Sequence, residues 1–326
     1  MKAVLCKAFG PPETLSVEDV PVPACGPGMV RIRVHAAGVN FPDTLIIEGK
    51  YQLRPEPPFS PGAEVAGVID AVGAGVTGFA PGDRVMALTG WGGFAEQVAV
   101  ESFRVTPMPA TMDFPTAAGF AMTYGTSMHA LRQRGRLKAG ETLLVLGAGG
   151  GVGLTAVELG RQMGARVIAA ASSPAKLDAA RAAGAEEVID YGRDSLKARI
   201  KELTGGRGVD VVYDPVGGDL FDEALRCMAW NGRLLVVGFA SGRIPQAPAN
   251  LMLLKGCEVV GVYWGAFRKN EPEAERRNVD DLFAWHAAGR LHPRIDRVLP
   301  LGKAAEALTA LRDRAVTGKI VLTMDA

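Results

Sequence analysis

Three glycines have the spacing that allows a backbone turn to hold a phosphate. Gly147, Gly150 and Gly153 follow the apolar segment 142–146, which predicts a buried strand, and they open a segment, 151–163, with apolar residues at helical spacing. Such glycines permit a tight turn, close approach of a pyrophosphate and packing of the helix on the strand, and the helix N-terminus offers free N–H groups. The pattern predicts a dinucleotide site; the alternative is a packing turn without a cofactor. The expected phosphate-binding residues are Gly147, Gly150, Gly151, Val152 and Gly153.

The next expected strand, 166–170, ends without a carboxylate. A site for NAD usually carries Asp or Glu about 20 residues after the turn, where it binds the ribose 2′-hydroxyl. Residues 169–176 instead read Ala-Ala-Ala-Ser-Ser-Pro-Ala-Lys. Ser172 and Ser173 can donate hydrogen bonds to a 2′-phosphate, and Lys176 can supply charge, so NADPH is favoured. The alternative for Lys176 is a solvated lysine on a helix.

Strand and helix patterns alternate from about residue 119 onward. This alternation predicts a right-handed, doubly wound parallel sheet. The apolar run 259–264 is expected to close it as an edge strand that pairs across a homodimer. The expected strands are 142–146, 166–170, 187–190, 209–213 and 232–238, and the expected helices include 173–183, 196–203 and 220–228.

Residues 1 to about 118 predict short strands separated by Pro-Gly turns. In 30–35, Val, Ile and Val alternate with Arg, Arg and His, which indicates a half-buried strand with His35 on the exposed face. After a helix at 303–317, the strand 319–323 is expected to rejoin this region. The expected fold is therefore α/β, with a discontinuous β-rich domain (1–118 and 290–326) and a Rossmann domain (119–289).

The composition excludes several classes of function. The 36 basic and 35 acidic residues leave a net charge of +1, so the electrostatic footprint of a nucleic-acid or membrane-surface protein is absent. No apolar run approaches the length that crosses a bilayer, and the N-terminus lacks a signal-peptide pattern. The four cysteines are far apart and form no CxxC pair, which favours free thiols and a cytoplasmic protein.

Taken in order, several motifs resemble those of the medium-chain dehydrogenase/reductase superfamily, most closely its zinc-free quinone oxidoreductase (zeta-crystallin-like) branch. The resemblance extends over essentially the whole chain and implies a GroES-like catalytic domain beside the Rossmann domain. It is carried by 36–43, 61–68, 78–85, 92–96, 147–153, 214–218 and 318–322.

The residues that bind zinc in related alcohol dehydrogenases are missing. Those enzymes have Cys after the Gly-Val that corresponds to Gly38-Val39, and His in a Gly-His-Glu triplet; this chain has Asn40 and Ala63. Neither side chain can replace a thiolate or an imidazole as a zinc ligand, so no metal site is expected. Without a Lewis acid to stabilise an alkoxide, the site favours conjugated acceptors, whose negative charge hydrogen-bond donors can stabilise.

The resemblance also implies the roles of several residues. Asn40 and Asp43 match positions that line the active site, with Asn40 holding the substrate or the nicotinamide ribose. Tyr51 matches a tyrosine near the cleft, and Tyr124 and Thr126 lie where relatives approach the nicotinamide. For Tyr51 and Tyr124 the alternative is interior packing with a satisfied hydroxyl.

Further cofactor contacts follow from the same resemblance. Tyr191 is expected near the adenosine phosphate, Gly238 and Phe239 at the carboxyl edge of the sheet, and Lys319 beside the cofactor from the returning C-terminus. Arg268 can steer an anionic substrate, although a surface loop is favoured for its segment.

The expected function is NADPH-dependent, zinc-independent reduction of quinones or enones, which are small-molecule substrates. Two alternatives remain open: a reductase of α,β-unsaturated acyl thioesters, and an NADPH-binding protein with little turnover. No nucleic acid or membrane partner is expected.

Overall fold

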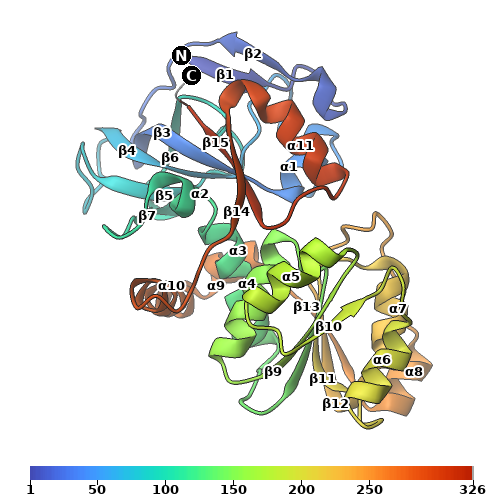
Figure 1. Ribbon diagram of the computed structural model, residues 1–326. Coiled ribbons are helices and arrows are strands. Elements are labelled where there is room, and N and C mark those ends of the chain that lie inside the picture. The colour runs from blue at the N-terminus through green and yellow to red at the C-terminus, as the bar shows by residue number, and fades with distance from the viewer. Residues whose placement is uncertain (325–326) are drawn as a thin grey trace. The chain divides into compact units, whose positions relative to one another are not determined.

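The computed structural model describes residues 1–324, and the chain divides into two compact units (Figure 1). Unit 1 comprises Met1–Met122 and the segment that returns at Ile295, and unit 2 comprises Thr123–Arg294. The sequence predicts that the chain passes from one domain to the other after residues 118 and 289.

Unit 1 is built on a largely antiparallel sheet of seven strands in which the N- and C-terminal parts of the chain pair. The last strand, β15, runs antiparallel to β3, with Ile320 opposite Val39. The sequence predicts only that this strand rejoins the N-terminal region. The strand order is β14-β15-β3-β4-β5-β7, and β6 also pairs with β3. The strands are β3 (Met29–Val39), β4 (Glu64–Val72), β5 (Arg84–Leu88), β6 (Gln97–Glu101), β7 (Val105–Pro107), β14 (Ile295–Pro300) and β15 (Lys319–Thr323); β1 (Lys2–Leu5) and β2 (Ser16–Asp19) form a separate pair.

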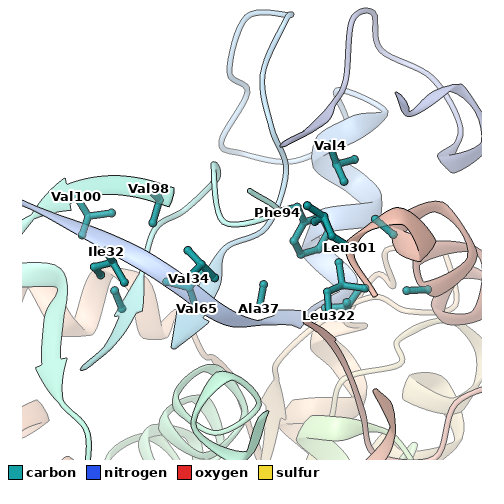
Figure 2. Close-up of a cluster of buried hydrophobic side chains, with 14 of the residues drawn as sticks. Val4, Ile32, Val34, Ala37, Val65, Phe94, Val98, Val100, Leu301 and Leu322 are labelled. Atoms are coloured by element: carbon teal, nitrogen blue, oxygen red, sulfur yellow. The ribbon is translucent and has the colours of Figure 1, made fainter. Parts of the chain in front are cut away.

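The core of unit 1 lies along one face of β3. Val30, Ile32 and Val34 are all buried, which confirms the period-two pattern of this strand. Figure 2 shows Ile32 and Val34 in a cluster of buried apolar side chains that also includes Phe94 and Leu322. The described part of unit 1 also contains the α-helices α1 (Phe41–Ile47), α2 (Phe114–Ala118) and α11 (Ala304–Arg312).

The opposite face of β3 is less exposed than its alternation suggests. The ring of His35 stacks on that of Phe114 with centroids 4.3 Å apart, and His35 is half-buried. The expectation that His35 is a surface residue was therefore wrong. The reason is tertiary: α2 packs against β3 on the side that the sequence pattern assigns to solvent.

Unit 2 contains a six-stranded sheet, all parallel, in the order β10-β9-β8-β11-β12-β13. This confirms the doubly wound arrangement, and two of the expected strands have the predicted bounds. The strands are β8 (Thr142–Leu146), β9 (Arg166–Ala171), β10 (Glu187–Asp190), β11 (Val209–Asp214), β12 (Met228–Val236) and β13 (Glu258–Gly261). The helices are α3 (Ala121–His129), α4 (Gly151–Gln162), α5 (Pro174–Ala182), α6 (Leu196–Leu203), α7 (Gly218–Arg226), α8 (Ala249–Lys255), α9 (Trp264–Asn270) and α10 (Pro272–Ala287).

Helices cover both faces of this sheet, α4 and α5 on one side and α6 to α8 on the other (Figure 1). Leu144 and Leu146 of β8 pack in one core cluster with Phe221 of α7, whereas Leu143 faces Gly160 of α4. A strand covered on both faces is largely apolar, as β8 is after Thr142.

The expected strand at 259–264 is shorter in the structure. β13 ends at Gly261, and Trp264 begins α9, where its indole lies against Gly125. Arg268 belongs to α9, with its guanidinium over the Trp264 ring and 3.7 Å from the Glu275 carboxylate, so the surface-loop interpretation was wrong. In residues 1–324 no helix has the length and apolar character needed to cross a membrane.

Candidate cofactor site and polar cluster

The glycine turn of unit 2 joins β8 to α4 and is held by its own backbone. Gly147 has φ +57°, which L-residues with a side chain rarely adopt. The Gly150 N–H donates to the Gly147 carbonyl at 3.0 Å, and the Ala148 N–H donates to the Ala170 carbonyl of β9 at 3.0 Å. The first N–H groups of α4, beginning at Gly151, are therefore presented at the carboxyl edge of the sheet, where a phosphate binds.

Two of these glycines differ in what surrounds them. A Cβ at Gly153 would lie 2.2 Å from the Gly147 carbonyl oxygen, so the turn itself requires glycine there. A Cβ at Gly150 would have only that same oxygen nearby, at 3.5 Å. The space at Gly150 is thus open in the protein, as a cradle for a ligand requires. Val152 lies in the first turn of α4.

The end of β9 brings the expected 2′-phosphate residues next to this turn. The stem of Lys176 lies on Gly149, since a Cβ added at that glycine would be 2.5 Å from the lysine Cβ and Cγ. Ser172 is exposed, and Ser173 is the N-cap residue of α5, although its side chain makes no capping hydrogen bond. The Tyr191 N–H donates to the Ala171 carbonyl at 3.2 Å, which places the end of β10 beside Ser172.

The turn after β11 is organised by a buried carboxylate that the sequence did not single out. Asp214 accepts hydrogen bonds from the Val216 and Gly217 N–H groups at 2.8 and 2.9 Å, and burial raises its pKa. The Gly238 N–H donates to the Asp214 carbonyl at 3.3 Å, and Phe239 contacts Gly217. Gly238 and Phe239 therefore lie at the carboxyl edge of the sheet, as expected.

Tyr124 differs from its expected role. Its side chain is buried in unit 2, and its hydroxyl donates to Glu158 Oε2 at 2.5 Å. Burial, reinforced by the neighbouring carboxylate, raises the pKa of Tyr124 well above its usual range, and burial also raises the pKa of Glu158. This contact favours the packing interpretation of Tyr124. Thr126, on the same helix, is half-buried.

In unit 1, four polar side chains from distant parts of the chain meet in what we call the polar cluster: Asn40, Asp43, Glu64 and Lys319. Only 6% of Asn40 and of Lys319 is exposed, and Asp43 and Glu64 are fully buried. Lys319 Nζ donates to Asn40 Oδ1 at 2.6 Å and to the Val39 carbonyl at 3.0 Å, and it lies 3.4 Å from Glu64 Oε2. The cluster therefore pairs an ammonium with a carboxylate through a shared amide.

Every hydrogen-bonding atom of the Asn40 side chain is engaged within this cluster. Its amide nitrogen donates to the Gly38 carbonyl at 3.1 Å and to Glu64 Oε2 at 3.2 Å, while its oxygen accepts from Lys319. To donate a hydrogen bond to a ligand, the Asn40 amide must therefore give up one of its two donated bonds, whereas its oxygen can accept a second one.

Asp43 stabilises the start of α1. Its Oδ2 accepts the Asn40 backbone N–H at 2.8 Å, half of a capping box. Burial raises its pKa to about 7, although the Asn40 N–H and the charge of Lys319 act in the opposite direction. Tyr51 is half-buried and packs against the apolar core of unit 1.

Glu64 is the member of the cluster that sequence reasoning missed. It lies within the 61–68 motif, and the signal that identifies it is an acidic residue at the start of an otherwise apolar strand. Ala63, at the position where zinc-dependent relatives have histidine, is buried and adjacent to it in sequence. Among residues 1–324, no group of three or more His, Cys, Asp or Glu side chains is arranged to hold a metal ion.

Both units match families of known proteins. Residues 26–110 match the alcohol dehydrogenase GroES-like domain, and residues 151–281 match the family described as zinc-binding dehydrogenase. The chain is 42% identical to a quinone oxidoreductase-like protein 2 homolog of Nematostella vectensis, covering 98% of this chain and 88% of that one. The quinone oxidoreductase of Pseudomonas syringae pv. Tomato DC3000 is 34% identical, with a TM-score of 0.92 over 99% of each chain. The Escherichia coli quinone oxidoreductase complexed with NADPH is 29% identical, with a TM-score of 0.93 over 99% of this chain and 100% of that one.

Proposed function

Because the chain belongs to the quinone oxidoreductase branch of the medium-chain dehydrogenase/reductase superfamily, we propose that it uses NADPH to reduce quinones or other conjugated carbonyl compounds without zinc. The observation that carries the proposal is the contact between Lys176 and the glycine turn. It brings a cation to the end of a strand where a site for NAD would have a carboxylate.

The residues around the turn fit NADPH. The pyrophosphate would meet the N–H groups at the start of α4 over the open space at Gly150, and the 2′-phosphate would meet Ser172, Ser173 and Lys176. The Escherichia coli relative, solved with NADPH, supports this assignment. When bound, NADPH supplies the hydride.

The polar cluster supports reduction of a conjugated acceptor without zinc. At the two positions where zinc-dependent relatives have Cys and His, this chain has an amide engaged with Lys319 and the methyl group of Ala63. A conjugated oxygen that gains negative charge needs hydrogen-bond donors rather than a Lewis acid, and Lys319 and Asn40 carry such donors. We propose that Lys319 and Asn40 contact the bound cofactor or acceptor, and that Asp43 stabilises the start of α1 next to them.

The proposal is tested by mixing the purified protein with NADPH and ortho- or para-quinones, simple enones or enoyl thioesters, and measuring NADPH oxidation. We expect turnover with quinones and enones, at a higher kcat/KM than with enoyl thioesters. Faster turnover of the thioesters would favour the acyl-thioester reductase, and oxidation with none of the three classes would indicate a binding protein and contradict the proposal.

A further inference from the structure

The carboxylate of Glu64 occupies a position that few acidic residues adopt. It is fully buried at the first residue of β4, where a charge is costly unless nearby donors compensate for the lost water. Three donors do so: the Met122 N–H to Oε1 at 2.8 Å, and the Asn40 amide and the Lys319 ammonium to Oε2 at 3.2 and 3.4 Å.

All three donors belong to unit 1, and each lies in a segment that leads to a proposed ligand-binding residue. Asn40 joins β3 to α1, Lys319 begins β15, and Met122 lies in the first turn of α3, the helix that also carries Thr126. A carboxylate that accepts an N–H in the first turn of a helix satisfies a donor with no partner within the helix, and its charge complements the helix dipole. One side chain therefore connects all three segments.

Glu64 and Lys319 together determine which way the Asn40 amide points. With its oxygen toward the ammonium and its nitrogen toward the carboxylate, both contacts are favourable. The flipped amide would put N–H groups against the ammonium and an oxygen against the carboxylate, so it is excluded. The space is also tight: a Cβ at Gly38 would lie 2.8 Å from Glu64 Oε2 and 2.0 Å from the Ala118 carbonyl oxygen.

The three hydrogen-bond contacts of Lys319 differ in length. Those to Asn40 and Val39 are 2.6 and 3.0 Å, whereas the contact to Glu64 is 3.4 Å. A ligand oxygen that takes one hydrogen of the ammonium will replace the longest contact most readily. Glu64 then remains beside the ammonium as its buried counter-charge.

We propose that Glu64 is a positioning residue for the reduction: it sets the orientation of the Asn40 amide and the Lys319 ammonium toward the bound ligands without itself contacting them. This inference rests on the proposed function. It extends that function by a residue whose role is orientation, acting on the two side chains that meet cofactor or acceptor.

Glu64→Gln tests the proposal, because a Gln side chain has one acceptor oxygen where Glu64 has two. Whichever way its amide turns, an NH₂ group faces either Met122 N–H or the Asn40 and Lys319 donors. The variant, loaded with NADPH, is mixed with phenanthrenequinone in a stopped-flow instrument, and the rate constant and amplitude of a single turnover are recorded.

We expect the rate constant to fall on the order of 10- to 100-fold, since small misplacements of reacting groups have effects of this size. The amplitude should stay near that of the unaltered protein when NADPH is saturating. A merely structural role would lower the amplitude, because less protein is folded, and leave the rate constant unchanged. In the ligand-free protein, the side-chain amide resonances of nitrogen-labelled Asn40 should shift in the variant.

The matched control is Glu141→Gln. Glu141 also pairs with a buried cation, Arg233, at 2.7 Å, but it lies next to the amino end of β8, at the edge of the sheet opposite the glycine turn. This variant should lose stability and keep the rate constant. If Glu64→Gln does not fold, Glu64→Asp replaces it, because it keeps the charge on a shorter side chain. Its rate constant should fall by less than the roughly 10- to 100-fold expected for Glu64→Gln.

The outcomes separate the two proposals. Suppose that the unaltered protein oxidises NADPH with an acceptor. If the Glu64 variant then has a normal rate constant, or if the Glu64 and Glu141 variants lose equally, only the role of Glu64 is overturned and the proposed function stands. If the unaltered protein oxidises NADPH with none of the acceptors tested, the proposed function is overturned, and the role of Glu64 with it.

Discussion

The glycine turn of unit 2 and the polar cluster of unit 1 are built in opposite ways. The turn consists of consecutive residues, 147–153, and the groups that we propose to face the phosphate are backbone N–H donors. The cluster consists of four side chains between residues 40 and 319, brought together by strands that pair across the whole length of the chain. The proposed phosphate-binding groups are therefore encoded locally, whereas the groups assigned to the acceptor depend on the complete fold of unit 1.

The two regions also differ in how a substitution would lower the free energy of unfolding. Backbone donors at a helix N-terminus are present whenever the helix forms. Buried charged side chains are stable only while every partner is in place, because an unpaired buried charge is costly. Substitutions in the cluster should therefore perturb stability through electrostatics, and substitutions in the turn through steric contact.

The largest effect is expected at Asp43. Its pKa of about 7 in the folded protein, against 3.8 in the unfolded chain, means that the folded state holds a proton that the unfolded state releases between these pH values. The contribution of Asp43 to the free energy of unfolding should accordingly be largest below about pH 4. This contribution should be lost as the pH rises through 7. The total is on the order of a few kcal/mol.

Asp43→Asn removes this dependence. Above pH 7 the variant should be more stable than the unaltered protein in urea unfolding, and the difference should shrink toward pH 4. Asp19→Asn, which changes an exposed carboxylate in the same unit, should leave the profile as it was. A variant that is less stable than the unaltered protein above pH 7 would show that the ionised Asp43 stabilises the cluster.

The next effect separates two glycines of the turn. At Gly153 an alanine Cβ meets the Gly147 carbonyl, and relieving such overlap costs about 1–3 kcal/mol, so Gly153→Ala should lower both Tm and NADPH affinity. Gly150→Ala has room in the ligand-free protein, so Tm should hold while the Kd for NADPH rises. Differential scanning calorimetry measures Tm, and isothermal titration calorimetry measures the Kd for NADPH. Unchanged affinity in Gly150→Ala would argue against a phosphate at this position.

A smaller effect is expected at Lys176. A charge-assisted hydrogen bond contributes about 1.5–3 kcal/mol, and a partly exposed one lies at the low end, so Lys176→Ala should raise the Kd for NADPH roughly tenfold. The Kd for NADH should change little. Lys197→Ala, at an exposed lysine on α6, is the control and should affect neither. An equal loss for both nucleotides would remove the assigned role of Lys176.

The smallest effect on activity concerns the sheet edge. In the part of the chain that the structure describes, β13 lies at the end of the strand order with β12 as its one neighbour. The nearby side chains of Leu253, Leu254 and Tyr263 are exposed. We expect two copies to pair at this edge, giving a dimer by light scattering with little influence on turnover. The mass of a single chain would contradict this arrangement.

How far the sequence predicts each region follows from the same contrast. Strands β8 and β10 and helix α6 have their predicted bounds because their apolar patterns are local. His35 and Trp264 were misplaced because α2 covers one residue and Gly125 accommodates the other, and neither contact leaves a local signal. In each case a contact distant in the sequence overrides the pattern of the strand.

The candidate site shows the same division. The glycine turn, Ser172 and Lys176 could be identified from spacing alone, and the structure brings them together. Asn40 and Lys319 were identified one at a time by resemblance, but their direct contact and its link to Glu64 depend on the pairing of β15 with β3. Tyr124 was assigned to the nicotinamide, and its bond to Glu158 emerges only once α3 and α4 are packed.

The most direct test is single-turnover oxidation of NADPH by phenanthrenequinone with protein that has been treated with a chelator and assayed for metals. If the polar cluster supports the reduction without zinc, metal-free protein should react as fast as untreated protein, and deuterium at the transferred position of NADPH should slow the reaction. Loss of the reaction on chelation, with recovery on addition of zinc, would contradict this and return a metal ion to the site at Asn40 and Ala63.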